Sequence, residues 1–272
     1  MTEISSIAIT DQEFALFQKL IYKIAGISLS DAKKVLLVGR LGKRLKHHSF
    51  VNFTQYYRYL STGTDTQELQ TMVDLLTTNE TYFFREPQHF DFLRDTALKA
   101  PRSGSTFRIW SGASSSGEEG YSMAMTLAEH LKDAPWEVFG SDISTIVLAK
   151  ARAGLYSLER TDGIPPAYMK KYCMKGVRSQ EGKFLISPEL RQHATFQQVN
   201  LTQPIKGVGD FDVIFLRNVM IYFDPETKRK VVENMLPFLK PNGYFIVGHS
   251  ESLNGITNLV KAVRPTIYQH AK

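Results

Sequence analysis

The chain has 272 residues, 43% of them hydrophobic and 22% charged, which is typical of a globular protein that buries a large core. Its single cysteine, Cys173, excludes an internal disulfide framework and a cysteine-based zinc cluster, so we expect a structural or surface thiol. The first residues lack the basic and apolar segments of a secretory leader, and no apolar stretch approaches the roughly 18 residues of a membrane span. These features favour a cytoplasmic protein without membrane insertion.

The net charge of +6 is unevenly distributed, because residues 32–60 contain no aspartate or glutamate. On a helix, Lys33, Arg40 and Arg44 would share one face. Another face carries apolar residues that we expect to pack inward, namely Val35, Val38, Leu41 and Leu45. The basic face is either a solvated surface or a docking surface for nucleic acid, anionic lipid or an acidic protein.

The first 76 or so residues show helical periodicity. Expected helices cover residues 11–26, 30–48, 50–60 and 66–78. The first ends at Gly26, a residue typical of helix C-caps, and the second starts with the N-cap candidates Ser30 and Asp31. A linker then leads into a helix that we expect to begin near Pro87.

From Phe107 onward, short apolar strands alternate with helices. Expected strands span residues 107–110, 136–142, 194–200, 211–218, 243–249 and 265–270. Expected helices span residues 121–131, 143–154 and 224–239. The alternation predicts an α/β fold with a doubly wound, mostly parallel sheet, whose ligands bind at the carboxyl ends of the strands.

The segment from Tyr156 to His193 interrupts this alternation. We expect it to form a helix and a small hairpin inserted in the main sheet. Such an insert is either a structural excursion or a subdomain that binds a partner.

A glycine-containing turn follows the first strand, with Gly112, Gly117 and Gly120. The spacing fits neither the G-x-G-x-x-G fingerprint nor a P-loop, because no Gly-Lys-Ser/Thr follows. Glu118 and Glu119 stand where a phosphate would bind, and they would repel a pyrophosphate. Either they only cap the helix, or they accept hydrogen bonds from an ammonium group or sugar hydroxyls.

Polar residues also follow the later strands. Asp142, about 20 residues past the glycine turn, either binds a ribose diol or caps the next helix. Asn200 is a candidate to bind an adenine edge. Arg217, Asn218 and Tyr222 follow an apolar run, and polar residues of these types are difficult to explain as part of the core. The ligand should therefore have a ribose, a cationic part and no phosphate chain. S-adenosylmethionine has all three features.

Six motifs occur in order at the spacing of one known family. They read TNETYFFRE, WSGASSSGEEGYSMAMTL, SDIS, RNVMIYFD, LKPNGYFIVGHSES and a late IY. Residues 79–268 thereby resemble the chemoreceptor glutamate O-methyltransferases, the CheR family, and the basic N-terminus is similar to that family's small first domain. The resemblance implies a Rossmann-like methyltransferase fold and methyl transfer from S-adenosylmethionine, with S-adenosylhomocysteine as product. The acceptors it implies are glutamates on the cytoplasmic helical bundle of chemoreceptors.

The resemblance also implies roles for individual residues. It places the cofactor on Asn79, Thr81, Arg85, Glu118, Asp142, Asn200, Leu201, Arg217 and Asn218. We assign Arg85 to hold charge near the reacting groups and Tyr222 to orient the acceptor. The docking surface for an acidic receptor helix comprises Lys33, Arg40, Lys43, Arg44 and Lys46. No metal takes part in this scheme.

Three segments divide the expected functions. Residues 1–76 form a helical docking domain, residues 77–90 a linker that contributes to the cofactor site, and residues 91–272 the methyltransferase domain. We expect a monomer that binds no nucleic acid. Some relatives bind a peptide from the receptor C-terminus through the insert at about residues 156–193, and here residues 174–184 leave that question open because a second early glycine is missing.

Two other functions fit parts of the pattern. A methyltransferase for RNA or DNA would suit the basic segment, but the aromatic residues of 52–60 recur at helical spacing, which favours a core. A scaffold that binds the cofactor or a receptor without catalysis is the other alternative. The presence of Asp142 and of the segment 217–223 disfavours it.

Overall fold

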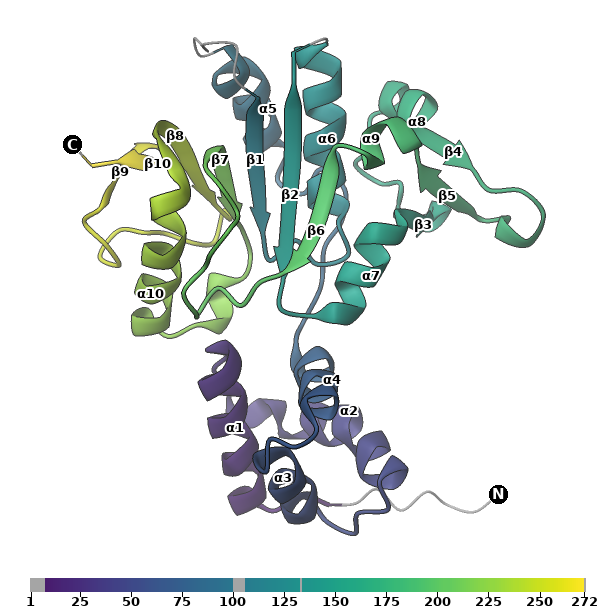
Figure 1. Ribbon diagram of the computed structural model, residues 1–272, viewed down its shortest axis with the longest axis vertical. Coiled ribbons are helices and arrows are strands. Elements are labelled where there is room, and N and C mark those ends of the chain that lie inside the picture. Colours follow the sequence, from purple (N-terminus) through teal and green to yellow (C-terminus); the bar gives the residue numbers. More distant parts are fainter. Residues whose placement is uncertain (1–7, 100–105, 133, 272) are drawn as a thin grey trace. The chain divides into compact units, whose positions relative to one another are not determined.

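The computed structural model describes residues 8–99, 106–132 and 134–271. Contacts within the chain divide it into two compact units (Figure 1). The first unit is the chain up to Thr78 together with Tyr222–Asp224, and the second comprises Asn79–Ile221 and Pro225–Lys272. Within the described ranges, no helix is long and apolar enough to cross a membrane.

Helices build the first unit. They are α1 (Asp11–Ala25), α2 (Lys34–His47), α3 (Phe53–Ser61) and α4 (Thr66–Leu76), with the 3-10 turn η1 (Asp31–Lys33) before α2. Aromatic side chains form the centre of the core, where the Phe17 ring centroid lies 5.9 Å from those of both Phe53 and Tyr56. All three side chains are fully buried, so this aromatic segment packs in the core as expected.

Local signals define both ends of α1. The Thr10 hydroxyl accepts a hydrogen bond from Glu13 N, and the Glu13 carboxylate accepts one from Thr10 N, which is a capping box. At the other end Gly26 has a φ of 70°, a left-handed conformation that glycine adopts without steric cost. The predicted end of this helix at Gly26 is confirmed.

One apolar stripe anchors α2. Leu37, Leu41 and Leu45 recur every four residues and are fully buried, which confirms the inward packing predicted for the last two. The same prediction for Val35 is wrong, because that side chain is 82% exposed. Val35 lies two residues before Leu37 and therefore about 200° around the helix from it.

The basic side chains of η1 and α2 fall into two groups. Arg44 pairs with the Glu68 carboxylate of α4, and Arg40 donates to the carbonyl of Thr77 at 2.8 Å, so both are engaged within the unit. The exposed members of the predicted docking set are Lys33, Lys43 and Lys46.

Glu68 is a buried acidic residue of this unit, with an exposed fraction of 4%. Besides pairing with Arg44, its carboxylate accepts a hydrogen bond from Tyr56 Oη at 2.7 Å and lies 3.2 Å from His48 Nε2. Burial opposes ionisation of Glu68, but the hydrogen bonds from Arg44 and Tyr56 outweigh it and hold the pKa below its usual value. Glu68 is therefore charged at neutral pH and stabilises the helical unit.

A mixed sheet forms the centre of the second unit. Its strands are β1 (Phe107–Gly112), β2 (Trp136–Asp142), β6 (Ala194–Gln198), β7 (Phe211–Leu216), β8 (Leu239–Val247), β9 (Val260–Arg264) and β10 (Ile267–His270). They follow the order β6-β2-β1-β7-β8-β10-β9, with the first five parallel and the last two antiparallel to their neighbours. The predicted doubly wound, mostly parallel sheet is confirmed. Strand β9 was not predicted, because its residues are mostly exposed and carry no alternating pattern.

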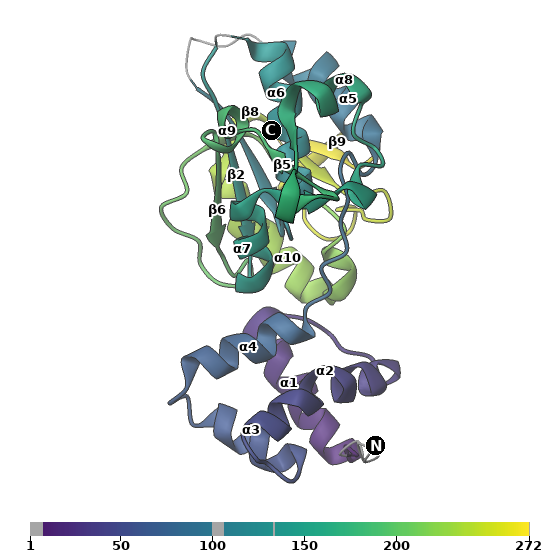
Figure 2. The same cartoon turned by 90° about the vertical axis from the view of Figure 1, so that its right-hand side faces the viewer.

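Helices surround the sheet (Figure 2), and side chains of its two faces pack against different elements. The helices are α5 (Pro87–Asp95), α6 (Glu118–Leu131), α7 (Thr145–Ala153) and α10 (Pro225–Met235). Ile109 of β1 lies in the core that includes residues of α5 and α6. Its neighbour Trp110 packs its ring instead against Phe139, Phe211 and Phe238, the last of which follows α10. The predicted start of α5 at Pro87 is also confirmed.

The insert contains a second, small sheet. Strands β3 (Leu155–Ser157), β5 (Lys183–Ile186) and β4 (Cys173–Lys175) pair antiparallel in that order, with helix α8 (Pro166–Tyr172) before β4 and α9 (Pro188–Arg191) after β5. The predicted helix and hairpin are confirmed, and β3 adds a third strand. Burial raises the pKa of the Cys173 thiol to about 12, which suits a structural role. Short 3-10 turns are η2 (Ala97–Lys99), η3 (Leu158–Arg160), η4 (Arg178–Gln180), η5 (Met220–Tyr222) and η6 (Leu236–Phe238).

We expect Glu68→Gln to destabilise the helical unit by about 3 kcal/mol, because it removes the anion from a buried ion pair. The folded-state pKa of Glu68 is lowered, so its contribution is present above the usual value of 4.5 and is lost as the pH falls further. Below this pH, the free energy of unfolding measured with urea should therefore fall more steeply for the wild type than for the variant.

The matched control is Asp11→Asn, which removes an exposed ion pair with Lys34. Its unfolding midpoint should equal that of the wild type. Equal midpoints for Glu68→Gln and the wild type at neutral pH would show that the buried pair does not stabilise this unit.

Candidate active site

The carboxyl ends of the parallel strands meet along one edge of the sheet. β1 ends at Gly112, β2 at Asp142, β6 at Gln198 and β7 at Leu216. The register places Gly112 beside both Ser141 and Leu216. The segments that follow these strands are therefore neighbours, and they contain many of the predicted site residues.

The loop after β1 has a strained backbone. Ala113, Ser115 and Gly117 all have positive φ, at 56°, 50° and 95°. Non-glycine residues seldom adopt this region, and strain of this kind is typical of functional sites. Gly117 is also crowded, since a Cβ there would lie 2.8 Å from Ala151 Cβ and 3.0 Å from Tyr156 Oη. The loop thus holds one defined conformation against α7 and β3.

Several backbone donors of this loop are bonded inside the protein. Ser114 N donates to Ser141 O at 2.8 Å, and Ser115 N donates to the Asp142 carboxylate at 2.9 Å. Gly117 N donates to Ser114 O at 3.0 Å. Phosphate-binding loops offer such donors to the ligand, so this geometry supports the interpretation of the turn as a loop that does not bind phosphate.

Asp142 connects two loops. Its Oδ2 accepts the bond from Ser115 N, and its Oδ1 accepts one from Ser144 N, the residue before α7, also at 2.9 Å. The side chain is almost buried, with 6% of the residue exposed. The N-cap of α7 is Ser144 and not Asp142, so the capping interpretation of Asp142 is wrong, and its bond from Ser144 N holds the turn before the helix instead. A carboxylate has about four acceptor positions, so these bonds are compatible with the ribose role, which stays a prediction.

Glu118 is fully buried at the first position of α6. Arg160 of η3 donates to its Oε1, and Ser116 Oγ donates to its Oε2 at 2.7 Å. The anion is thus held between the glycine-containing loop and the insert.

Glu119 has different partners. Ser111 Oγ donates to its Oε1 at 2.7 Å, and Arg217 Nη1 donates to its Oε2 at 3.1 Å. Burial raises the pKa of Glu119, and the positive charge of Arg217 opposes that shift. Of the two glutamates, Glu119 is the one joined to a residue that follows β7.

Arg217 is the most connected of the predicted residues, and its side chain is only 1% exposed. Besides its bond to Glu119, the guanidinium donates to the carbonyl of Arg85 and lies 3.1 Å from Glu86 Oε2. The Phe215 ring centroid lies 5.5 Å from it. These contacts join the TNETYFFRE segment to the end of β7 and the start of α6.

Glu86 is a site residue that the sequence analysis missed. Its φ is 56°, and its carboxylate accepts hydrogen bonds from Asn218 Nδ2 and His249 N, each at 3.1 Å, in addition to the contact with Arg217. Burial opposes its ionisation, but Asn218 and Arg217 outweigh burial and lower the pKa of Glu86. The available signal was its place directly after Arg85 in a motif that already carried three predicted residues.

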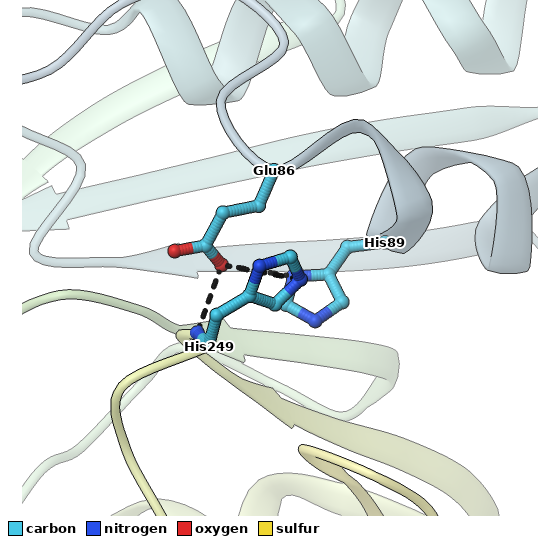
Figure 3. A group of neighbouring side chains, drawn as sticks. All are labelled: Glu86, His89 and His249. Carbon is cyan, nitrogen blue, oxygen red and sulfur yellow. Dashed lines mark hydrogen bonds and ion pairs between the residues drawn. The ribbon is translucent and has the colours of Figure 1, made fainter.

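Glu86, His89 and His249 converge as a group whose ligand-type atoms lie within 4.8 Å of one another (Figure 3). Such a group resembles a metal site in composition. However, Glu86 Oε2 already accepts the bond from His249 N and faces Arg217, whose guanidinium supplies the positive charge that a metal ion would bring. Burial and Arg217 together lower the pKa of His89 to about 3, so its imidazole is neutral. We interpret the group as part of the Arg217 network.

The linker residues predicted to contact the cofactor lie in the same unit. The carbonyl of Asn79 accepts a hydrogen bond from Ser115 Oγ at 2.9 Å, which attaches the linker to the loop after β1. Thr81 is buried, and the half-buried Arg85 donates through Nη1 to Glu80 O at 3.2 Å.

The remaining predicted residues are less connected to this network. Asn200 Oδ1 accepts hydrogen bonds from the backbone and hydroxyl of Thr202, which forms a local turn after β6, and Leu201 is buried. Tyr222 groups with the helices of the first unit, where its carbonyl accepts a hydrogen bond from Ser28 N at 2.9 Å. Its role beside the acceptor stays a prediction.

The strand ends also fit a polar ligand. Five buried side-chain polar atoms have no hydrogen-bond partner among the residues that the structure describes. Three of them follow strands at this edge, namely Ser114 Oγ, Ser144 Oγ and Arg217 Nε. Buried polar atoms are normally paired, so their gathering here marks the edge as a place for further polar contacts.

Comparison with known proteins assigns both units to one family. Residues 12–77 match "CheR methyltransferase, all-alpha domain", and residues 79–269 match "CheR methyltransferase, SAM binding domain". The chain is 41% identical to the chemotaxis protein methyltransferase of Escherichia coli (strain K12), over 100% of this chain and 94% of that protein. It is 40% identical to chemotaxis protein methyltransferase 2 of Pseudomonas aeruginosa, over 96% of this chain and 94% of that protein. The chain therefore belongs to the CheR family and is an S-adenosylmethionine-dependent methyltransferase of chemotaxis.

Proposed function

We propose that this enzyme methylates glutamate side chains on the cytoplasmic helical bundle of chemoreceptors, as a monomer in the cytoplasm, and forms glutamyl methyl esters for chemotactic adaptation. The observation that carries the proposal is the contact set of Arg217, which joins the motif containing Arg85 to the end of β7. Ligands of doubly wound sheets bind at that edge. The names of the curated relatives support chemoreceptors as the methylated proteins.

Residues at this edge suit the parts of S-adenosylmethionine. The Asp142 carboxylate would accept hydrogen bonds from the ribose hydroxyls, and Asn200 with Leu201 would contact the adenine. The buried Glu118, whose carboxylate is paired with Arg160, would contact the amino acid portion of the cofactor. The remaining proposed cofactor contacts are Asn79, Thr81, Arg85, Arg217 and Asn218.

The proposed reaction needs orientation more than proton transfer. Bound S-adenosylmethionine supplies a methyl group on a sulfonium. A glutamate has a pKa of about 4.3 and is already ionised at neutral pH. Its carboxylate oxygen forms the new bond to the methyl carbon as the carbon–sulfur bond breaks, so that the electron pair stays on sulfur and no proton moves. Arg85 would hold the acceptor carboxylate, and Tyr222 would orient it. Alignment of this kind is worth roughly 7 to 11 kcal/mol.

We assign residues 1–76 to receptor docking, residues 77–90 to the linker and residues 91–272 to the methyltransferase domain. The exposed lysines Lys33, Lys43 and Lys46 offer positive charge to an acidic receptor helix. Arg40 and Arg44 contribute less directly, since their guanidinium groups are bonded inside the helical unit.

The insert offers a place for a receptor peptide. Strand β4 is at an edge of the small sheet, and exposed apolar side chains lie on it and just after it, at Met174 and Val177. An extended peptide adds to such an edge through main-chain hydrogen bonds. We therefore include binding of a receptor C-terminal peptide in the proposal.

A methyltransferase that acts on nucleic acid is less well supported. Single-stranded RNA is recognised on exposed aromatic rings. In the helical unit, Phe53 and Tyr56 of the aromatic segment are fully buried and serve the core.

The product of the reaction should be an ester. After transfer of a labelled methyl group to purified receptor fragments, mild alkali should release the label as methanol, because glutamyl methyl esters hydrolyse under conditions that leave N-methyl groups intact. The measurement is the volatile label recovered before and after alkali. Alkali-stable label would reject glutamate as the acceptor.

Asp142→Ala should weaken binding of S-adenosylhomocysteine about tenfold to 150-fold, since a hydrogen bond to a charged group contributes roughly 1.5 to 3 kcal/mol. Isothermal titration calorimetry measures the effect. Asp210→Ala, which truncates an exposed aspartate before β7, is the control and should bind normally. If Asp142→Ala folds and binds like the wild type, Asp142 does not contact the ribose.

Charge reversal at Lys43 and Lys46 should raise the KM for receptor about fivefold to tenfold at low ionic strength, with the difference shrinking as salt screens the interaction. The affinity for S-adenosylhomocysteine should stay unchanged. Lys261→Glu on β9 reverses an exposed lysine elsewhere and serves as the control. Equal KM values for the double variant and the control would remove α2 from the docking surface.

A further inference from the structure

Glu251, four residues after the end of β8, accepts hydrogen bonds from three backbone N–H groups. Its Oε2 accepts from Asn218 N and Gly248 N, and its Oε1 accepts from Met220 N, each at 2.8 Å. The residue is 8% exposed. One buried carboxylate thus satisfies donors from two separate turns, those after β7 and after β8.

The pairing of β7 with β8 explains why these donors need a partner. The register runs to Leu216 beside Val247, and beyond that pair the ladder does not continue. Asn218 and Met220 lie past the end of the ladder, so neither N–H has a partner strand. Buried N–H groups without a partner are costly, and the Glu251 side chain replaces the missing strand.

The turn held in this way is strained. Asn218 has a φ of 57°, in the left-handed region that residues other than glycine seldom adopt. The turn after β8 also comes close to it, since a Cβ at Gly248 would lie 3.0 Å from Asn218 N and 2.8 Å from Glu251 Oε2. Glycine at 248 therefore allows the contact, and Glu251 maintains it.

The conformation of this turn decides where two site residues point. The Asn218 side chain donates to Glu86 Oε1 at 3.1 Å, and Arg217 immediately before it forms the contacts with Glu119 and the Arg85 carbonyl. We propose that Glu251 is a positioning residue of the cofactor site, which fixes the left-handed turn at Asn218 through three backbone hydrogen bonds. This inference rests on the proposed contact of Asn218 with the cofactor.

Glu251→Gln tests the role with the least change in shape. Glutamine keeps one acceptor oxygen, and its NH₂ group is placed against a backbone N–H, so at least one of the three bonds is lost. We expect binding of S-adenosylhomocysteine, measured by calorimetry on the full chain, to weaken at least about tenfold, because small displacements of positioning groups have large effects.

A matched control separates positioning from stability. Asp212, near the other end of β7, also accepts a backbone hydrogen bond, from Arg108 N at 2.8 Å, and pairs with Lys240. Asp212→Asn should lower the thermal midpoint but leave the affinity of the folded protein for S-adenosylhomocysteine within twofold of the wild type. A parallel loss of affinity in both variants would mean that Glu251 is merely structural, and it would overturn the inference.

Two further variants keep the test decisive. If Glu251→Gln does not fold, Gly248→Ala replaces it, because the added methyl group displaces the Asn218 turn while Glu251 remains. Unchanged affinity of Gly248→Ala for S-adenosylhomocysteine overturns the inference.

Asn218→Ala tests the underlying assignment of Asn218 to the cofactor. Loss of affinity in Asn218→Ala with none in Glu251→Gln rejects the positioning role alone, whereas normal affinity in Asn218→Ala rejects the proposed cofactor contact and the positioning role together.

Discussion

The site of the second unit depends on the ion pairs of the buried Arg217 guanidinium. A cation that is 1% exposed needs anionic partners close by, because loss of one partner from a buried pair costs about 3 to 5 kcal/mol. Glu86 and Glu119 are those partners, and the carbonyl of Arg85 accepts a further bond. The requirement to pair one charge therefore places the segment before α5, the start of α6 and the end of β7 in one arrangement.

At this edge of the sheet, carboxylate side chains accept the backbone hydrogen bonds that connect neighbouring loops. Asp142 joins the loop after β1 to the residue before α7, and Glu251 joins the turns after β7 and β8. Each accepts N–H groups that strand pairing leaves without partners. The result is an acidic edge with a strained backbone at Ala113, Ser115 and Asn218. The carboxylates of this edge are compatible with a cationic nucleoside such as S-adenosylmethionine.

Local sequence information was sufficient where a single residue type has one physical reason for its position. Gly26 and Pro87 marked helix ends correctly, because left-handed backbone and a missing N–H are properties of single residues. It failed where the outcome depends on a distant partner. Val35 was placed inward although Leu37 defines the buried stripe. Glu86 was overlooked because Arg217 and Asn218, which bind its carboxylate, are 131 or more residues away in the chain.

The amino-acid sequence by itself determined the alternation of strands and helices, the order of the six motifs and thereby the family, because periodicity and short motifs are local properties. Only the tertiary structure decided the partners of the charged groups: that Arg44 faces Glu68, that Glu118 pairs with Arg160 and Glu119 with Arg217, and that Glu251 holds the Asn218 turn. Several carboxylates compete for few cations and donors, and the sequence contains no measure of the distances that settle this competition.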